Sequence, residues 1–217
     1  MNKLGKRLSV IAGQVSGKRV ADVGCDHGKL AKYLFDNKKV ESMILSDISE
    51  PSLRKAIDLI SPKGYNCEYI CCDGLKGYAD KKIDECVISG MGGEEIIKII
   101  STSPINIDSF ILSPQRDIIT TKKFMLEKGF SIIFDIVIKE KEKFYNVFKC
   151  VKKECVEEIS EFDLYFGKTN FESNQSDLEE FVDFEIKKVQ NILDRQSEKS
   201  NKHLNYLAIL NQYKKRK

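Results

Sequence analysis

Val20-Ala21-Asp22-Val23-Gly24-Cys25-Asp26-His27-Gly28-Lys29-Leu30 is the stretch that decides the fold of this chain. It begins as a short apolar run, passes an acid and a glycine into a polar loop, and continues with a helical pattern. This order predicts a strand, a tight glycine turn and the N-terminus of a helix. Such a turn brings backbone N–H groups and the positive end of a helix up to a ligand. We therefore expect a nucleotide-type binding loop around Gly24.

Strand-like and helix-like runs alternate on both sides of this loop as far as Gly129. A short amphipathic helix is expected near the N-terminus, because apolar residues recur at helical spacing from Leu4 to Val15. The expected strands are Arg19–Gly24, Ser42–Asp47, Asn66–Cys72, Glu85–Ser89 and Ser109–Ser113. The expected helices are His27–Asn37, Glu50–Ile60, Glu94–Ser101 and Ile118–Lys128. This alternation predicts a parallel sheet that is covered by helices on both faces.

The pattern changes after Gly129. Phe130–Lys139 and Phe144–Lys152 are two β-rich runs without a helix between them, which predicts an antiparallel hairpin. We therefore expect an α/β, Rossmann-like core with a mostly parallel seven-stranded sheet that ends in an antiparallel hairpin. That ending is typical of class I S-adenosylmethionine (SAM) methyltransferases and is absent from NAD-type doubly wound folds.

A different pattern occupies the end of the chain. Leu178, Val182, Ile186, Val189 and Leu193 form a narrow apolar stripe like a coiled-coil seam. The stripe is interrupted by polar residues and expected to continue through Leu204, Leu207, Ala208 and Asn211. This predicts two antiparallel helices, about 174–196 and 202–215, with one long helix as the alternative. We place a methyltransferase domain at 1–168 and a C-terminal helical hairpin at 169–217.

Composition and charge narrow the class of protein. The 217 residues carry a net charge of +3, with basic zones at both ends of the chain, which could contact phosphates if they share a face. Solvated charged helices are the alternative. Seven cysteines without a CxxC pair favour reduced thiols in a cytoplasm and no structural metal. No apolar run is long enough for a membrane span, and no signal peptide is evident. We expect a cytoplasmic protein that does not enter a membrane, with a monomer favoured.

The spacing within the opening loop separates three kinds of nucleotide site. An NAD fingerprint needs glycines where Asp26 and Lys29 stand, and a P-loop needs Ser or Thr where Leu30 stands. What remains is D-x-G-x-D-x-G, a variant of the SAM loop. Gly24 allows close approach of the amino-acid part of SAM, and Asp22 can accept hydrogen bonds from its ammonium. Cys25 and His27 belong to the same loop.

Two further acids follow later strands. Asp47 can accept hydrogen bonds from both ribose hydroxyls, although a helix cap is the alternative. Asp73 can accept a hydrogen bond from the exocyclic amine of adenine. Three acids at the ends of successive strands indicate SAM binding far more strongly than any one of them. The residues we assign to the cofactor are Asp22, Gly24, Cys25, His27, Asp47, Ile48, Asp73, Gly74 and Gly90.

The fourth strand ends in Ser89-Gly90-Met91-Gly92-Gly93-Glu94. Amino-group methyltransferases often carry an Asn/Asp-Pro-Pro-aromatic loop here, and this chain has neither the prolines nor the aromatic residue. Its glycines leave room for a flat base, although a plain loop before a helix is the alternative. We assign RNA or substrate contacts to Lys6, Arg7, Met91, Gly92, Gly93 and Arg116.

Several segments together resemble a known family. They are Lys6-Arg7-Leu8, VADVGCDHGKL (20–30), SDISEPSL (46–53), CDGL (72–75), SGMGGEEI (89–96), LSPQ (112–115) and KEKEKFYNV (139–147). The chain resembles the bacterial tRNA adenine-N1 methyltransferases of the TrmK type over about residues 3–168, and its last segment resembles their C-terminal helical pair. It departs from the family pattern at Cys25 (often Ser or Thr), Gln115 (often Asn) and Lys168 (often Pro).

The resemblance implies SAM-dependent methylation of N1 of adenosine 22, in the D-loop region of tRNA. N1 already carries a lone pair, so alignment with the methyl group matters more than a strong base. A carboxylate that accepts a hydrogen bond from the exocyclic amine would make N1 more nucleophilic, and Asp26 is our candidate for this role. Glu140 and Tyr145 would help to orient the base. Lys6, Arg7 and Arg116 would hold phosphates. The alternatives are a SAM methyltransferase with another target (rRNA, protein or a small molecule) and a non-catalytic SAM-fold protein that binds RNA.

Overall fold

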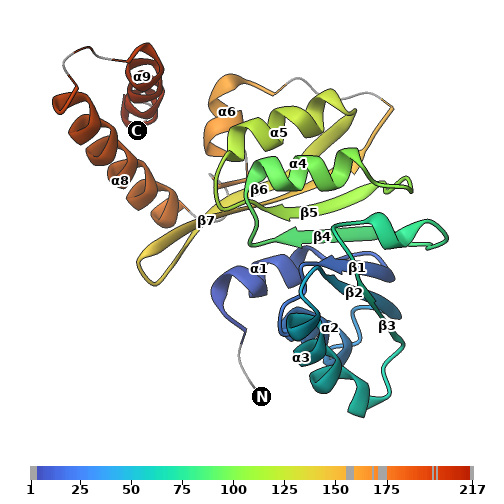
Figure 1. The fold of residues 1–217 in the computed structure, drawn as a ribbon. Coiled ribbons are helices and arrows are strands. Elements are labelled where there is room, and N and C mark those ends of the chain that lie inside the picture. The colour runs from blue at the N-terminus through green and yellow to red at the C-terminus, as the bar shows by residue number, and fades with distance from the viewer. Residues whose placement is uncertain are drawn as a thin grey trace.

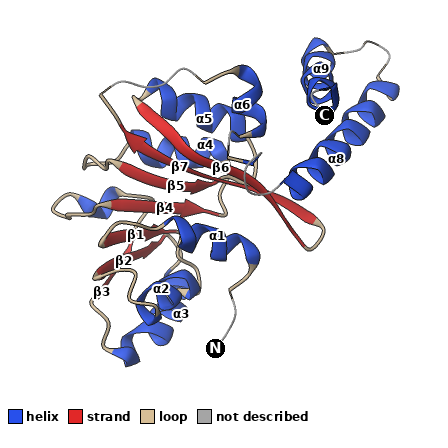
Figure 2. Ribbon diagram, turned by 180° about the vertical axis from the view of Figure 1, so that it is seen from behind, coloured by secondary structure: helices blue, strands red, loops and turns tan. Residues whose placement is uncertain are grey.

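One mixed sheet organises the molecule. The computed structural model describes residues 4–154, 159–167, 169–170, 175–196, 198 and 200–215. The sheet has seven strands in the order β3-β2-β1-β4-β5-β7-β6 (Figures 1 and 2). The strands are β1 (Arg19–Val23), β2 (Ser42–Asp47), β3 (Cys67–Cys71), β4 (Glu85–Ser89), β5 (Ser109–Ser113), β6 (Phe130–Glu140) and β7 (Lys143–Lys152). β1 to β5 pair in parallel, whereas β7 runs antiparallel to both β5 and β6. The predicted fold class is confirmed.

Helices cover both faces of this sheet, as the alternation of runs predicted. The helices are α1 (Lys6–Gln14), α2 (Lys29–Asp36), α3 (Glu50–Ile60), α4 (Gly93–Ser101), α5 (Ile118–Glu127), α6 (Glu161–Phe166), α8 (Gln175–Asp194) and α9 (Asn201–Lys215), with short 3-10 turns η1 (Ser61–Lys63) and η2 (Lys76–Tyr78). α1, α2 and α3 pack on one face around Ile11, Leu34 and Ile60. α4 and α5 pack on the other around Ile96 and Met125 (Figure 1). Among the described residues no helix is long and apolar enough to cross a membrane.

The hairpin reaches beyond the rest of the sheet. β7 pairs with β5 only through Phe148–Val151, and β6 and β7 continue to their turn at Lys141 and Glu142. Because β7 is antiparallel to β5, this turn lies on the side of the sheet where β5 and the other parallel strands end. In Figure 1 the hairpin accordingly extends past those strand ends toward α8. The hairpin therefore supplies side chains above the carboxyl edge of the sheet.

The C-terminal helices form an antiparallel pair that packs on the hairpin. Asp183 of α8 pairs with Lys214 of α9, and Glu185 lies farther along α8 opposite the earlier residue Tyr206, so the two helices run in opposite directions. The expected seam on α8 is confirmed, because Leu178, Val182, Val189 and Leu193 are buried. The predicted pair of helices replaces the alternative of one long helix.

The expected seam on α9 was wrong except at Leu207, which packs against the hydrophobic cluster between the helices. Leu204 is exposed, as are Ala208 and Asn211, and the buried residues are instead Ile209, Leu210 and Tyr213. The reason is α6, a helix that the sequence did not predict. The rings of Phe166 in α6 and Tyr213 lie 5.2 Å apart, so α9 turns its apolar face toward α6 as well as α8. The part of the predicted helical domain that falls on 171–174 lies outside the described residues.

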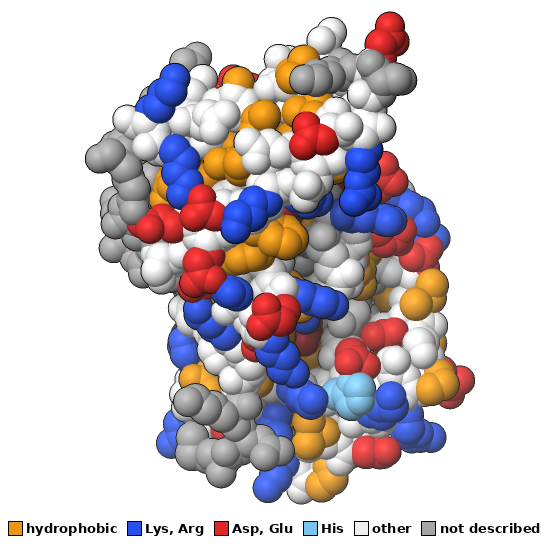
Figure 3. Space-filling model, turned by 90° about the vertical axis from the view of Figure 1, so that its left-hand side faces the viewer, with side chains coloured by type: hydrophobic (Ala, Val, Ile, Leu, Met, Phe, Trp, Pro, Cys, Tyr) orange, Lys and Arg blue, Asp and Glu red, His pale blue; other side chains and the backbone are white. Residues whose placement is uncertain are grey.

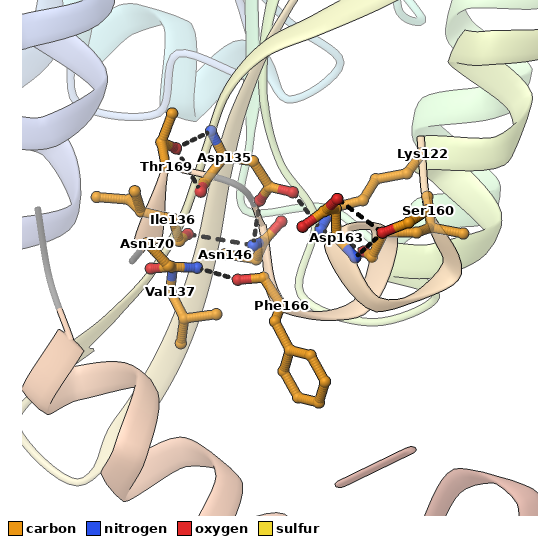
Figure 4. Close-up of polar contacts among 11 residues, drawn as sticks. Lys122, Asp135, Ile136, Val137, Asn146, Ser160, Asp163, Phe166, Thr169 and Asn170 are labelled. Carbon is orange, nitrogen blue, oxygen red and sulfur yellow. Dashed lines mark hydrogen bonds and ion pairs between the residues drawn. The ribbon is translucent and has the colours of Figure 1, made fainter. Parts of the chain in front are cut away.

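Polar side chains cover the outer edge of β6. The backbone N–H groups of Asp135, Val137 and Lys139 donate to Thr169 Oγ1, Asn170 Oδ1 and Asp177 Oδ2 at 2.8, 2.8 and 2.7 Å. Figure 4 shows Thr169 and Asn170 in this position beside the strand. Alternate N–H groups of an edge strand point outward, where they would otherwise invite pairing with another chain. The connection to the C-terminal helices therefore closes the sheet on this side.

Candidate active site

The predicted SAM residues gather at the carboxyl edge of the parallel strands. Asp22 lies in β1, Asp47 is the last residue of β2, and Asp73 lies just after β3. In open α/β sheets ligands bind outside the carboxyl ends of the strands, at the point where the strand order reverses. Here the order reverses between β1 and β4. Figure 3 views the molecule from the side toward which these ends point and shows basic and acidic side chains intermingled there.

Asp22 is the buried acid of this edge, with 4% of its surface exposed. Burial and, to a smaller extent, the neighbouring charge of Asp47 raise the pKa of Asp22 to about 7. Gly24 follows with φ +76°, a left-handed conformation that favours glycine. A site that holds a carboxylate against its desolvation penalty is suited to a cationic ligand group.

The loop after β1 is tied to the end of β2. The N–H of Asp26 donates to Asp47 Oδ2 at 3.2 Å, and the N–H of Ser49 donates to Asp47 Oδ1 at 2.8 Å. Asp26 has φ +46°, an uncommon conformation for a residue with a side chain. Its carboxylate lies 2.5 Å from Nδ1 of His27, and both side chains are exposed. The structure thus brings Asp26, His27 and Asp47 together and leaves the Asp26 carboxylate accessible.

The third acid stands beside an exposed apolar residue. Asp73 forms an ion pair with Lys76 at 2.6 Å, and this contact lowers the pKa of Asp73. Ile48, directly after Asp47, is 72% exposed. An exposed apolar side chain between two acids provides a face for a flat ring. A Cβ on Gly74 would lie 2.8 Å from Ile99, so this glycine is also required for packing against α4.

The glycine loop after β4 lies across the SAM loop. Gly90 has φ +85°, and a Cβ there would lie 3.8 Å from an Arg7 nitrogen and 3.9 Å from a Gln115 nitrogen. A Cβ on Gly24 would meet the terminal methyl of Met91 at 2.3 Å. The side chain of Met91 therefore covers the SAM loop, with Arg7 and Gln115 close to Gly90.

The next two glycines differ from each other. A Cβ on Gly92 would lie 2.9 Å from Nε of Arg116, a side chain that is 75% exposed. Gly93 is buried, and a Cβ there would meet Thr121 Oγ1 at 2.3 Å. The absence of a side chain at Gly93 is thus explained by the close approach of α4 and α5. Its predicted substrate contact stays a prediction.

Of the residues predicted to orient the base, Tyr145 is the one beside Arg7. The Arg7 guanidinium carbon lies 5.0 Å from the centre of the Tyr145 ring. Glu140 instead accepts a hydrogen bond from the N–H of Lys6 at 2.5 Å, at the first residue of α1. The Lys6 ammonium pairs with Asp177 of α8, also at 2.5 Å. Glu140 and Lys6 therefore join α1 to the hairpin and to α8, and their roles in base or phosphate binding stay predictions.

Sequence reasoning missed a groove next to this site. A groove of about 870 Å³ lies between the loop after β5, the hairpin, α6, α8 and α9. It includes Gln115, Arg116 and Tyr145 from the edge just described, together with Phe184 and Tyr206 from the helical pair. On α8 the signal was available in the sequence, because residues 181, 184, 185 and 188 share one face at helical spacing. The neighbouring stripe from Leu178 to Leu193 is more regular and dominates the pattern of this helix.

Comparisons with known proteins agree with this geometry. Residues 4–148 match the family model described as a methyltransferase domain. The chain is 30% identical over 147 residues to the Mycoplasma genitalium protein named "Putative tRNA methyltransferase MG248". This match covers 65% of this chain and 67% of that protein. It is 26% identical over 151 residues to the tRNA (adenine(22)-N(1))-methyltransferase of Bacillus subtilis, covering 67% and 63% of the two chains.

Solved structures match almost the whole chain. The structure of M. capricolum TrmK with S-adenosyl-homocysteine has a TM-score of 0.86 at 23% identity and covers 97% of both chains. The B. subtilis TrmK structure has a TM-score of 0.78 at 19% identity and covers 98% of this chain and 96% of that one. At these identities the matches establish a shared fold, and that fold includes the C-terminal helices.

Proposed function

Because this chain belongs to the methyltransferase-domain family, we propose that it is a SAM-dependent tRNA methyltransferase that modifies N1 of an adenosine in the D-loop region. By resemblance the target is adenosine 22. The observation that carries the proposal is the gathering of Asp22, Asp47 and Asp73 at one sheet edge beside the Gly90 loop. The tRNA target is further supported by the names of the related proteins. We propose that the protein acts as a monomer in the cytoplasm.

The residues at the edge fit SAM group by group. The buried Asp22 would hold the ammonium, with Gly24 allowing the amino-acid part to approach the backbone. Asp47 would accept the ribose hydroxyls, although its two oxygens already receive the N–H groups of Asp26 and Ser49. A carboxylate oxygen has two lone pairs, so these bonds leave acceptor capacity for the ribose. Asp73 would accept a hydrogen bond from the amine of the adenine, and Ile48 would pack against the face of its ring.

SAM supplies a methyl group on a positively charged sulfur. The adenine N1 lone pair would form the new bond to the methyl carbon, and the electron pair of the broken carbon–sulfur bond would stay on sulfur. The adenine becomes cationic, so a nearby carboxylate stabilises the product and the transition state that leads to it. The exposed carboxylate of Asp26 would accept a hydrogen bond from the exocyclic amine of the target adenine. The remaining contribution is alignment, for which Tyr145 and Arg7 form a wall beside Gly90.

The experiment is a methyl-transfer assay with the full chain. Purified protein is incubated with SAM labelled in its methyl group and with an unmodified tRNA transcript, and the RNA is digested to nucleosides. We expect the label in 1-methyladenosine, and its loss when the D-loop adenosine is replaced by guanosine in an otherwise identical transcript. Label in another nucleoside, or transfer that persists after this replacement, would overturn the assignment of the target. No binding of SAM by calorimetry would overturn the enzyme itself.

A further inference from the structure

The groove beside the active site has an aromatic lining. Among the described residues, six rings line it, and we call it the aromatic groove: Phe144, Tyr145, Tyr165, Phe181, Phe184 and Tyr206. The rings come from three separate parts of the chain, namely the start of β7, α6 and the helical pair. The tertiary structure thus assembles a surface of stacked and tilted rings that no single segment carries.

Several of these rings contact one another in the groove. Phe144 lies 5.6 Å from both Phe181 and Phe184 between ring centres, and Tyr165 stacks on Tyr206 at 5.6 Å. Phe184 is nevertheless 51% exposed. A large exposed aromatic residue within a continuous aromatic lining indicates a binding surface, because water contact with that ring is unfavourable.

The charge around the aromatic groove favours an anionic partner. Arg116, Lys143, Lys188 and Lys202 line it. Lys143 and Lys202 have no ion pair with any residue in the described part of the chain. The groove's acids are Asp117, Glu142 and Glu185, so the four cations exceed them by one. Asp117 lies 3.6 Å from Arg116, and Glu185 pairs with Lys188 at 2.8 Å and accepts a hydrogen bond from Tyr206 at 3.3 Å. Exposed rings combined with unpaired cations are the two elements that bind single-stranded nucleic acid, where bases stack and phosphates are neutralised.

The aromatic groove is continuous with the candidate active site. Gln115 and Tyr145 belong to both, since Gln115 lies near Gly90 and the Tyr145 ring lies under Arg7. We propose that the aromatic groove binds an unpaired nucleobase of the RNA next to the target adenosine, stacked against Phe184. This inference rests on the proposed function, since the RNA that enters the groove is the RNA that is methylated. An apolar peptide segment is the alternative occupant.

The absence of tryptophan from the chain permits a direct test. Phe184→Trp places a single indole in the groove, which can be excited separately from the tyrosines, and Leu204→Trp places one on the exposed part of α9, outside the groove lining. On titration with the unmodified tRNA transcript we expect quenching of the first variant, saturating at the same concentration as methyl transfer, and no quenching of the second. Equal responses from both variants, or none from Phe184→Trp, would overturn the proposal.

Affinity measurements separate stacking from packing and from charge. Phe184→Ala should raise the Kd for the transcript by about 5- to 150-fold, the range for loss of one base–aromatic stack. Phe184→Leu keeps an apolar side chain and should weaken binding nearly as much, whereas Phe184→Tyr should restore it. Because Phe184 is neutral, the salt dependence should not change, but Lys143→Ala should reduce the slope by about one.

Two controls accompany these variants: a measurement of SAM affinity and the variant Leu204→Ala. All these variants should bind SAM as the unaltered protein does, and Leu204→Ala should bind the transcript normally. If the unaltered protein methylates the transcript but Phe184→Ala binds it equally well, the groove proposal fails while the proposed function stands. That result would favour the peptide occupant. If the unaltered protein neither binds nor methylates the transcript, the proposed function itself fails.

Discussion

Asp22 is buried in a way that suits a cationic ligand and lowers the stability of the protein without ligand at neutral pH. Its pKa of about 7 results from burial, because few water molecules reach the carboxylate at the end of β1. An acid whose pKa is raised on folding contributes stability below its unfolded pKa, near 4, and loses that contribution as the pH rises through 7. A bound ammonium group would reverse this effect by favouring the charged form.

The affinity for SAM should therefore depend on pH in a defined direction. If the ammonium binds the charged carboxylate of Asp22, affinity should rise with pH by up to about tenfold per unit below pH 7, and should fall again above about pH 8, where the α-amino group of SAM loses its proton. Asp22→Asn should bind SAM at least about tenfold more weakly at pH 8, without this rise at lower pH. Calorimetry from about pH 5.5 to about pH 8.5 measures both. An affinity for the unaltered protein that is flat across this range would contradict the assignment of Asp22.

Without ligand, Asp22→Asn should have the opposite effect on stability. The amide carries no charge to desolvate, so the variant should be more stable than the unaltered protein at pH 8 and should lose this advantage toward pH 5. Denaturant unfolding at the two pH values measures the difference. A variant that is equally destabilised at both would show that Asp22 acts through packing instead.

Asp26 makes a different prediction, because its carboxylate is exposed and its backbone N–H is the group that contacts Asp47. Asp26→Asn keeps the backbone contact and removes the charge, so SAM affinity should stay within about twofold while the methyl-transfer rate falls by roughly tenfold or more. Single-turnover transfer and SAM binding measure the two quantities. Equal losses in both would make Asp26 a cofactor residue only. His27→Ala is the matched control for the loss of the Asp26–His27 contact.

At the scale of elements, the molecule depends on how a long hairpin is anchored. β6 is the outermost strand, and side chains of Thr169, Asn170 and Asp177 cover its outward N–H groups. Asp135, at the start of this row, also forms a buried ion pair with Lys122 of α5 at 2.6 Å. Lys122 donates further to the carbonyl of Leu164 at 3.0 Å, which fixes α6. Figure 4 shows Asp135 with Lys122 and Asn146, and Thr169 and Asn170 beside the strand.

The buried pair should be costly to break and much less costly to replace. Lys122→Met leaves the Asp135 carboxylate buried without its partner, so we expect a loss of about 3–5 kcal/mol in the free energy of unfolding. The double variant Lys122→Met, Asp135→Leu removes both charges and should recover most of that loss. Urea unfolding measures both variants. A double variant as unstable as the single one would show that the network acts through shape rather than charge.

At the scale of the whole molecule, the C-terminal helices are part of the core. A third hydrophobic cluster joins Val137 of β6, Phe162 and Phe166 of α6, and the inner faces of α8 and α9. We propose 169–217 as the helical hairpin that follows the methyltransferase domain along the chain. Its packing nevertheless makes it continuous with the β6–β7 hairpin, and the aromatic groove exists only where the two meet.

Removal of residues 169–217 should therefore weaken what remains. Val137, Phe162 and Phe166 would each lose part of the roughly 1.5–3 kcal/mol that burial of a large apolar side chain contributes. The edge of β6 would lose its side-chain partners as well. We expect the melting temperature of the shortened chain to fall by at least about 5 °C, with new dye-binding apolar surface. An unchanged melting temperature and no added dye binding would show that the core is independent of the helical pair.

The parts predicted from sequence are those that local pattern controls. The Asp22–Gly28 loop, the alternation of strands and helices, the hairpin and the α8 seam all follow from periodicity and turn chemistry, and each depends mainly on neighbours in the chain. The three acids could be grouped because parallel strands carry their carboxyl ends to one edge. Where the chain leaves this regular pattern, prediction became weaker: α6 was missed and the phase of α9 was wrong.

By itself, the sequence determined a SAM-type loop and the sheet that presents it, because these depend on spacing along the chain. Only the tertiary structure decided that Glu140 accepts a hydrogen bond from the first residue of α1 and that Arg7 lies over Tyr145. It also decided that Asp177 binds both the edge of β6 and the Lys6 ammonium. The aromatic groove belongs to the same class. Its rings come from residues 144 to 206. Contacts between segments so far apart are set by packing of the whole chain, to which local spacing gives no access.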